Sequence, residues 1–222
     1  MEAYLERQRQ KRGLIQTLNA PRRWQFSAAQ PTLASMANLI TLARILLIIP
    51  FCILFLVNAE WNMKAALVVF AIASLTDFID GRVARARGEV SALGAAIDPL
   101  ADKLLITAAL ILLLRNGIIT GVGVIAVIAI ILRELLVSGL REAVVGRGAS
   151  LPVTTLAKWK TTAQLLAAGL LLAAAPYGVV GAGLRPFATG MLWLAAVLTI
   201  WTGADYTIRA IKELGRPEQS NE

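Results

Sequence analysis

Six long apolar segments dominate the sequence and constrain its fold more than any other feature. They fall near residues 39–57, 61–81, 95–114, 118–140, 161–180 and 187–206. A helix that crosses the hydrocarbon core of a bilayer needs roughly 20 consecutive apolar residues. Hydrophobic residues make up 57% of the chain and charged residues 16%, whereas soluble domains contain roughly 45–50% and 25%. The segments therefore predict an all-α polytopic membrane protein with six transmembrane helices.

The distribution of basic residues sets the predicted orientation. One side of the predicted bundle carries a basic leader (residues 1–37) together with Arg82, Arg85, Arg87, Arg141, Arg147, Lys158, Lys160, Arg209, Lys212 and Arg216. The other side has Lys64, Arg115 and Arg185. Because cytoplasmic loops are enriched in Lys and Arg, we expect an integral protein of the inner (cytoplasmic) membrane with both termini in the cytoplasm. The predicted organisation is the leader, a six-helix domain at 38–212 and a polar tail at 213–222.

The composition also limits the chemistry. The chain has no histidine and one cysteine, Cys52, so His-based metal sites, Ser-His-Asp triads and internal disulfides are excluded. Its formal charge is +8, which suits anionic lipid or a phosphate-bearing substrate. The basic residues flank apolar spans and do not form one face interleaved with aromatic residues, so we do not expect nucleic-acid binding.

Four aspartates form two pairs beside the second and third apolar segments. Asp77 and Asp80 are spaced i,i+3, and Asp98 and Asp102 are spaced i,i+4, so each pair shares one helical face. The second helix is expected to run toward the cytoplasm and the third away from it, which places the pairs at adjacent helix ends. Facing carboxylates can hold one or two hard cations, and Mg²⁺ or Mn²⁺ suits an all-oxygen ligand set.

Two other interpretations of these acids remain open. They could pair with Arg82, Arg85, Arg87 and Lys103 as an interfacial charge network, or they could form part of a metal-ion or proton-coupled transport pathway. A pathway predicts further acids deeper in the bundle. Glu134, Glu142 and Asp205 instead fall toward the same side as the aspartates. This clustering at one depth favours a site over a pathway.

Small residues lie between the two pairs of acids. Gly81 directly follows Asp80 and allows a ligand to approach the backbone without a Cβ in the way. Ala84 lies about one turn further along, and Gly94 precedes Asp98 by one turn. Small residues also permit close helix packing. Together with the acids, they indicate a cleft wide enough for a nucleotide.

The acids and small residues fit one spaced pattern, D-x-x-D-G-x-x-A-R-x8-G-x3-D-x3-D, through Asp77, Asp80, Gly81, Ala84, Arg85, Gly94, Asp98 and Asp102. This pattern resembles the signature of the CDP-alcohol phosphotransferase family. The resemblance implies six transmembrane helices, a homodimer, and an active site at the cytoplasmic ends of the second and third helices. It also implies transfer of a phosphatidyl or similar group from a CDP-linked donor to an alcohol, with release of CMP.

The resemblance further implies roles for individual residues. Asp77, Asp80 and Asp98 would hold two divalent metal ions, Mg²⁺ or Mn²⁺, with help from Asp102, which would also act as the general base. The CDP pocket would be formed by Asp77, Gly81, Ala84, Arg85, Gly94, Asn38 and Thr41. Asn38 is also the predicted N-cap of the first helix.

Further segments narrow the acceptor. NLITLARILLIIP at 38–50, DPLADKLL at 98–105, RELLVSGLRE at 133–142 and AKWKTTAQ at 157–164 resemble the branch of the family that transfers the phosphatidyl group of CDP-diacylglycerol to sn-glycerol 3-phosphate. The residues predicted to bind the acceptor phosphate are Arg133, Ser138, Arg141 and Lys160. Arg147 and Lys158 are assigned to the positive side of the membrane border. Siblings that use phosphatidylglycerol, inositol phosphate or serine are the alternatives.

Overall fold

The computed structural model describes residues 36–57, 59–87, 92–147, 149, 151–152 and 154–215. Within these ranges, only the backbone is described for 36–41, 77–87 and 92–102. The chain divides after Thr32, and every described residue belongs to the unit that begins at Leu33. The predicted leader up to residue 35 and the tail after residue 215 lie outside the described residues.

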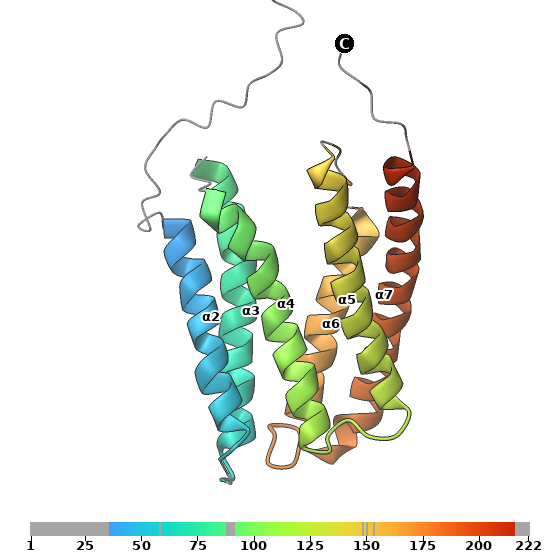
Figure 1. The fold of residues 1–222 in the computed structure, drawn as a ribbon. Helices are drawn as coiled ribbons and strands as arrows, with labels where there is room; N and C mark the ends of the chain where they lie inside the picture. Colours follow the sequence, from blue (N-terminus) through green and yellow to red (C-terminus); the bar gives the residue numbers. More distant parts are fainter. Residues whose placement is uncertain are drawn as a thin grey trace, which may run out of the picture. The chain divides into compact units, whose positions relative to one another are not determined.

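Six α-helices make up the described part of the chain, in agreement with the predicted all-α class. They are α2 (Met36–Leu54), α3 (Asn62–Arg87), α4 (Ala92–Arg115), α5 (Gly123–Gly146), α6 (Thr155–Ala173) and α7 (Arg185–Leu214), with a short 3₁₀ turn, η1 (Ala182–Leu184), before α7. The helices run side by side, and the start of α2 lies at the same end of the bundle as the end of α7 (Figure 1). The end of α3 and the start of α4 lie at that end too.

The helix boundaries differ from the predicted ones in two informative places. α6 begins at Thr155 and ends at Ala173, although its apolar segment was placed at 161–180. The Thr154 hydroxyl caps this early start by accepting a hydrogen bond from the Ala157 amide at 3.3 Å. α2 begins at Met36, so Asn38 lies within its first turn and the predicted N-cap is wrong.

Several helices continue beyond their apolar segments. α3 extends to Arg87, α5 to Gly146 and α7 to Leu214, where connections or a tail were expected. Once a helix has formed, each further residue adds one hydrogen bond while only that residue's backbone is fixed, so a helix need not end where hydrophobicity ends. The α3–α4 and α5–α6 connections are therefore shorter than expected.

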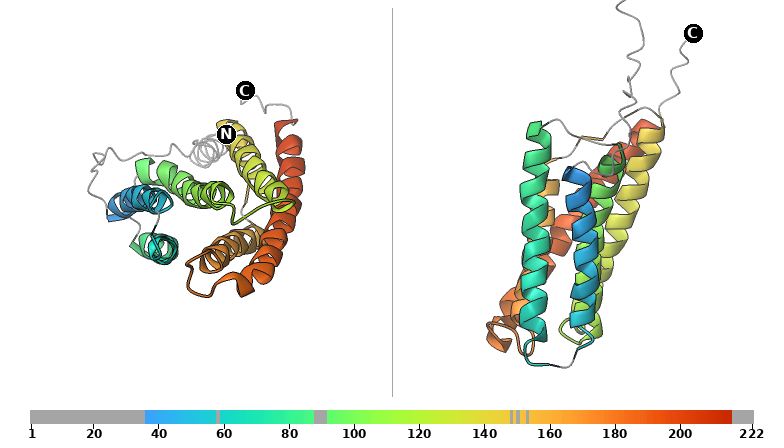
Figure 2. Two further views of the ribbon diagram at one scale, coloured as in Figure 1. Left: turned by 90° about the horizontal axis from the view of Figure 1, so that it is seen from below. Right: turned by 90° about the vertical axis from the view of Figure 1, so that its left-hand side faces the viewer.

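The helices pack in two groups that meet along α6 and α4. α2 packs on α3 and α4, and α7 packs on α5 and α6, while α3 and α4 both contact α6. The left view of Figure 2 shows this arrangement along the helices. In the first group Phe51 packs edge-on against Phe55, with ring centroids 5.2 Å apart, and lies 5.9 Å from Phe70. In the second group alanines let the helices approach closely, as at the fully buried Ala167 and Ala195.

Around Arg133 and Glu134, the polarity of α5 is the reverse of that in a soluble protein. Arg133 and Glu134 are 9% and 6% exposed, while Leu132 and Leu135 are 61% and 67% exposed. Exposed large hydrophobic side chains recur on every helix. Broad apolar surface of this kind suits contact with lipid, and buried charge is retained where it is paired or functional.

Two helical segments in the described residues are long and apolar enough to cross a membrane, Gly123–Gly146 and Ala182–Leu214. Shorter apolar stretches cover Leu42–Leu54 in α2 and Asn62–Thr76 in α3. The structure therefore supports a membrane protein with two long apolar helices.

Candidate functional site

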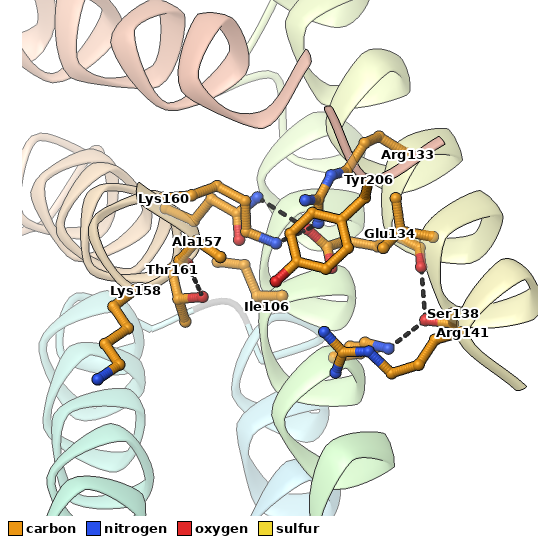
Figure 3. Close-up of a pocket in the computed structure, with 13 residues that line it drawn as sticks. Ile106, Arg133, Glu134, Ser138, Arg141, Ala157, Lys158, Lys160, Thr161 and Tyr206 are labelled. Atoms are coloured by element: carbon orange, nitrogen blue, oxygen red, sulfur yellow. Dashed lines mark hydrogen bonds and ion pairs between the residues drawn. The ribbon is translucent and has the colours of Figure 1, made fainter. Parts of the chain in front are cut away.

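A cavity of about 270 Å³ with charged side chains in its wall opens between α4, α5, α6 and α7. It is lined by five cationic side chains and one carboxylate, together with neutral polar and apolar groups (Figure 3). The charged residues are Lys103, Arg133, Arg141, Lys158, Lys160 and Glu134. Such an excess of positive charge in a cavity favours the binding of an anion.

The Glu134 carboxylate is the centre of a buried hydrogen-bond network. Its Oε1 atom accepts a hydrogen bond from Lys160 Nζ, one from Arg133 Nη1 at 3.3 Å and one from Gln164 Nε2 at 3.2 Å. Gln164 also donates to Thr199 Oγ1 at 2.9 Å. A buried carboxylate is tolerated only when its partners compensate for the loss of water. Glu134 thus ties α5 to α6, and through Gln164 to α7.

Arg133 is held by several neighbours at once. Its Nη1 donates to Glu134 and its Nη2 donates to Thr202 Oγ1 at 3.0 Å. Its Cζ lies 5.9 Å from the centre of the Tyr206 ring, within the range of a cation–π contact. Gly203 on α7 lies directly against its side chain. The position of Arg133 is therefore set by α5 and α7 together.

Tyr206 connects the arginines to the α5–α6 connection. The Cζ of Arg141 lies 5.6 Å from its ring centre. The Tyr206 hydroxyl donates to the Pro152 carbonyl at 3.0 Å and accepts from the Thr154 amide at 3.1 Å. Because Tyr206 is 1% exposed, it forms a fixed wall of the cavity.

Ser138 links α5 to α4. Its Oγ accepts a hydrogen bond from Lys103 Nζ and donates to the Glu134 backbone carbonyl at 2.6 Å. Lys103 directly follows Asp102 in the sequence. The signature segment is thereby continuous with the cavity wall.

The structure brings together all four residues that the sequence assigned to the acceptor phosphate. Arg133, Ser138, Arg141 and Lys160 line the same cavity; their binding of an acceptor stays a prediction. Lys158, assigned to the membrane border, also lines it. Arg147 does not, and it donates instead to the Leu214 carbonyl at the end of α7.

Three polar residues of the cavity were not predicted from the sequence: Lys103, Gln164 and Tyr206. Lys103 appeared only as a candidate partner of the aspartates, although its position beside Asp102 pointed to the site. Gln164 lies one turn after Lys160 in an apolar segment, which is a usable signal because buried amides need partners. Nothing local marks Tyr206, because it reaches the cavity only through the packing of α7.

The signature aspartates lie on the two helices predicted to carry them. Asp77 and Asp80 belong to the last turns of α3, and Asp98 and Asp102 to the first half of α4. Only the backbone of these four aspartates is described. The same holds for the other predicted site residues, Gly81, Ala84, Arg85, Gly94, Asn38 and Thr41. Among the side chains that the structure does describe, no group of three His, Cys, Asp or Glu residues forms a metal site. The predicted metal and CDP sites remain predictions.

Fold and cavity together define a helical protein with broad apolar surface and a cavity rich in basic side chains, next to the helix pair α3 and α4 that carries the four aspartates. The sequence profile described as CDP-alcohol phosphatidyltransferase matches residues 34–201. The chain belongs to this family of phosphatidyltransferase enzymes.

Curated relatives are similar over most of their length. A protein of Rickettsia typhi is 39% identical over 175 residues, covering 78% of this chain and 94% of its own. A protein of Bacillus subtilis is 38% identical over 185 residues (78% and 93%), and one of Escherichia coli K12 is 35% identical over 182 residues (81% and 97%). All three are named CDP-diacylglycerol–glycerol-3-phosphate 3-phosphatidyltransferase.

Proposed function

We propose that this chain transfers the phosphatidyl group of CDP-diacylglycerol to sn-glycerol 3-phosphate, giving phosphatidylglycerophosphate and CMP in phospholipid biosynthesis. The observation that carries the proposal is the basic cavity that begins one residue after the signature Asp102. An anionic acceptor held there would meet a CDP-linked donor bound by α3 and α4. The shared name of the relatives supports the same reaction.

The charge of the cavity suits this acceptor. Glycerol 3-phosphate is mostly a dianion near neutral pH, and the cavity wall offers five cations against one carboxylate. Arginine donates well to phosphate through its planar guanidinium. We assign the phosphate to the group formed by Arg133, Ser138, Arg141 and Lys160. Serine or phosphatidylglycerol would place less anionic charge in the same cavity.

The chemistry of the aspartates suits divalent cations. Asp77, Asp80, Asp98 and Asp102 lie at the adjoining ends of α3 and α4, and carboxylate oxygens are the ligands that Mg²⁺ and Mn²⁺ prefer. Two bound cations would neutralise charge on the donor's phosphates. We assign metal binding to Asp77, Asp80 and Asp98, with help from Asp102.

The reaction also needs a base and a place for the nucleotide. Asp102 would accept the proton of the 1-hydroxyl of glycerol 3-phosphate, whose oxygen forms a bond to the diacylglycerol-linked phosphorus. The bond from that phosphorus to CMP then breaks. We assign the CDP moiety to Asp77, Gly81, Ala84, Arg85 and Gly94, together with Asn38 and Thr41 of α2.

The setting that we propose is a membrane bundle. All six helices would cross the inner membrane, both termini would face the cytoplasm, and the acyl chains of the donor would stay in lipid. The exposed apolar side chains on every helix support this setting. A homodimer is carried over from the resemblance to the family alone.

CMP release tests the proposal directly. Detergent-purified protein is given CDP-diacylglycerol and Mg²⁺ or Mn²⁺, with glycerol 3-phosphate, phosphatidylglycerol, inositol phosphate or serine supplied in turn. We expect release with glycerol 3-phosphate. Release with a different acceptor alone would refute the acceptor assignment, and no release from folded protein with any acceptor would refute the phosphatidyltransferase proposal.

A further inference from the structure

The position of Arg133 depends on Gly203 of the facing helix α7, which has no side chain to occupy the space that Arg133 takes. A Cβ placed on Gly203 would lie 2.6 Å from Cγ and 3.2 Å from Nε of Arg133. Real Cβ atoms do not approach another carbon that closely, so Arg133 can take its path along α7 only because residue 203 is glycine. The buried Nε of Arg133 has no hydrogen-bond partner in the described part of the chain.

The outer nitrogens of Arg133 are already engaged. Nη1 is bonded to Glu134 and Nη2 to Thr202. Lys160, the other cation at this depth, is bonded to the same Glu134 oxygen. Glu134 therefore holds both cations in place before any anion arrives.

Arg141 is in a different situation. Among the described residues it has no hydrogen bond or ion pair, and its fixed contact is with the face of the Tyr206 ring. Its guanidinium lines the cavity on the side toward Ser138 (Figure 3). Its donors are therefore available to an incoming anion.

We propose that Gly203 and Glu134 are positioning residues of the acceptor site, which hold Arg133 and Lys160 in place and leave Arg141 as the principal ligand of the acceptor phosphate. This inference rests on the proposed function, and it divides the roles of the residues assigned there. Pre-organised cations cost little reorganisation when the anion binds. Displacing Arg133 should therefore weaken acceptor binding and leave the chemical step largely intact.

The test is a kinetic comparison of Gly203→Ala with Gly190→Ala. Both glycines lie on α7, but a Cβ on Gly190 would meet nothing within 4 Å. With saturating CDP-diacylglycerol, we expect Gly203→Ala to raise the KM for glycerol 3-phosphate about tenfold or more while kcat changes by less than about threefold. Gly190→Ala should leave both unchanged. A KM for Gly203→Ala equal to that of Gly190→Ala would overturn the proposal.

Two further variants distinguish an effect on the positions of Arg133 and Lys160 from a general disturbance of the fold. In an Arg133→Ala background the added methyl group has nothing to displace, so Gly203→Ala should change KM by less than about twofold, whereas independent sites would give additive effects. Glu134→Gln should raise KM in the same direction as Gly203→Ala, because the neutral amide no longer holds Lys160. Additive effects in the Arg133→Ala background, or wild-type KM for Glu134→Gln, would overturn the proposal.

Binding of inorganic phosphate keeps this test independent of the proposed function. If folded wild-type protein released no CMP with glycerol 3-phosphate, the proposed function would fail. The positioning role can then be tested by the rise in unfolding temperature that inorganic phosphate causes, because a ligand that binds the folded state stabilises it. We expect weaker stabilisation for Gly203→Ala than for Gly190→Ala, and equal stabilisation would overturn the proposal.

Discussion

At the scale of the residue, the charged side chains of this site are of two kinds. Some are hydrogen-bonded to other groups of the protein, and others have donors that a ligand could bind. Glu134 accepts from Lys160, Arg133 and Gln164, so its cost of burial is met within the fold. Arg141 faces the same cavity with its guanidinium against a tyrosine ring. The spacing of Arg133 and Arg141 in the sequence puts both on one side of a helix. Their different contacts in the folded protein give them different roles: Arg133 is hydrogen-bonded to Glu134 and Thr202, and Arg141 lies against Tyr206.

Asp102 is the residue whose substitution should affect the chemistry most. Asp102→Asn removes the proposed base while keeping the shape of the side chain. We expect CMP release to fall at least about 100-fold, measured with glycerol 3-phosphate in detergent, with normal insertion into membranes. Asp205→Asn is the matched control, since the Asp205 side chain is 40% exposed and bonded only to Arg209, at 2.9 Å, among the described residues. Wild-type activity of Asp102→Asn would contradict the assignment of the base.

At the scale of the element, each helix is positioned by its ends as well as by its apolar face. α4 ends at Arg115, and Gly117 follows with φ of 66°, in the left-handed region that glycine adopts readily. α6 ends in a tight turn, in which the Val180 and Gly181 amides both donate to the Ala173 carbonyl. These turns set where α5 and α7 start, and so which of their residues reach the cavity.

The turn after α6 provides a stability prediction. A Cβ on Gly178 would lie 2.4 Å from the Ala173 carbonyl oxygen and 2.8 Å from that of Ala175. Gly178→Ala must therefore shift backbone, and we expect it to reduce the free energy of unfolding by about 1–3 kcal/mol. Thermal unfolding in detergent measures the loss. Gly183→Ala, where a Cβ meets nothing within 4 Å, should change the free energy by less than about 0.5 kcal/mol. Equal stability of the two variants would show that the turn can relax.

At the scale of the whole molecule, the proposed reaction needs both groups of helices. The aspartates lie on α3 and α4, while the basic cavity is formed mainly by α5 and α6. The hydrogen bond from Lys103 to Ser138 is one described link between the two groups. Activity should therefore depend on the intact bundle.

Removal of metal tests the proposed metal site formed by the aspartates of α3 and α4. If carboxylates hold the cations that neutralise the donor phosphates, EDTA should lower CMP release at least about 100-fold, and excess Mg²⁺ or Mn²⁺ should restore it. Circular dichroism should show unchanged helix content, because buried apolar side chains hold the helices together. Full activity in chelator would rule out the proposed metal site.

Sequence alone determined the class of protein, the six helices and the signature that identifies the family. Apolar segments of membrane length permit few folds, and the aspartate pattern depends only on spacing along the chain. It also indicated Arg133, Ser138, Arg141 and Lys160 as candidates for one group, because the segments at 133–142 and 157–164 resemble the family branch whose acceptor is anionic.

Tertiary structure decided the ends of α6, the contact of Gly203 with Arg133, and the place of Tyr206 and Gln164 in the cavity wall. Each of these depends on how two or more helices pack, and periodicity along one helix carries no information about the facing helix. The sequence could therefore identify the charges of the site, but only the packed bundle could show which of them are already paired.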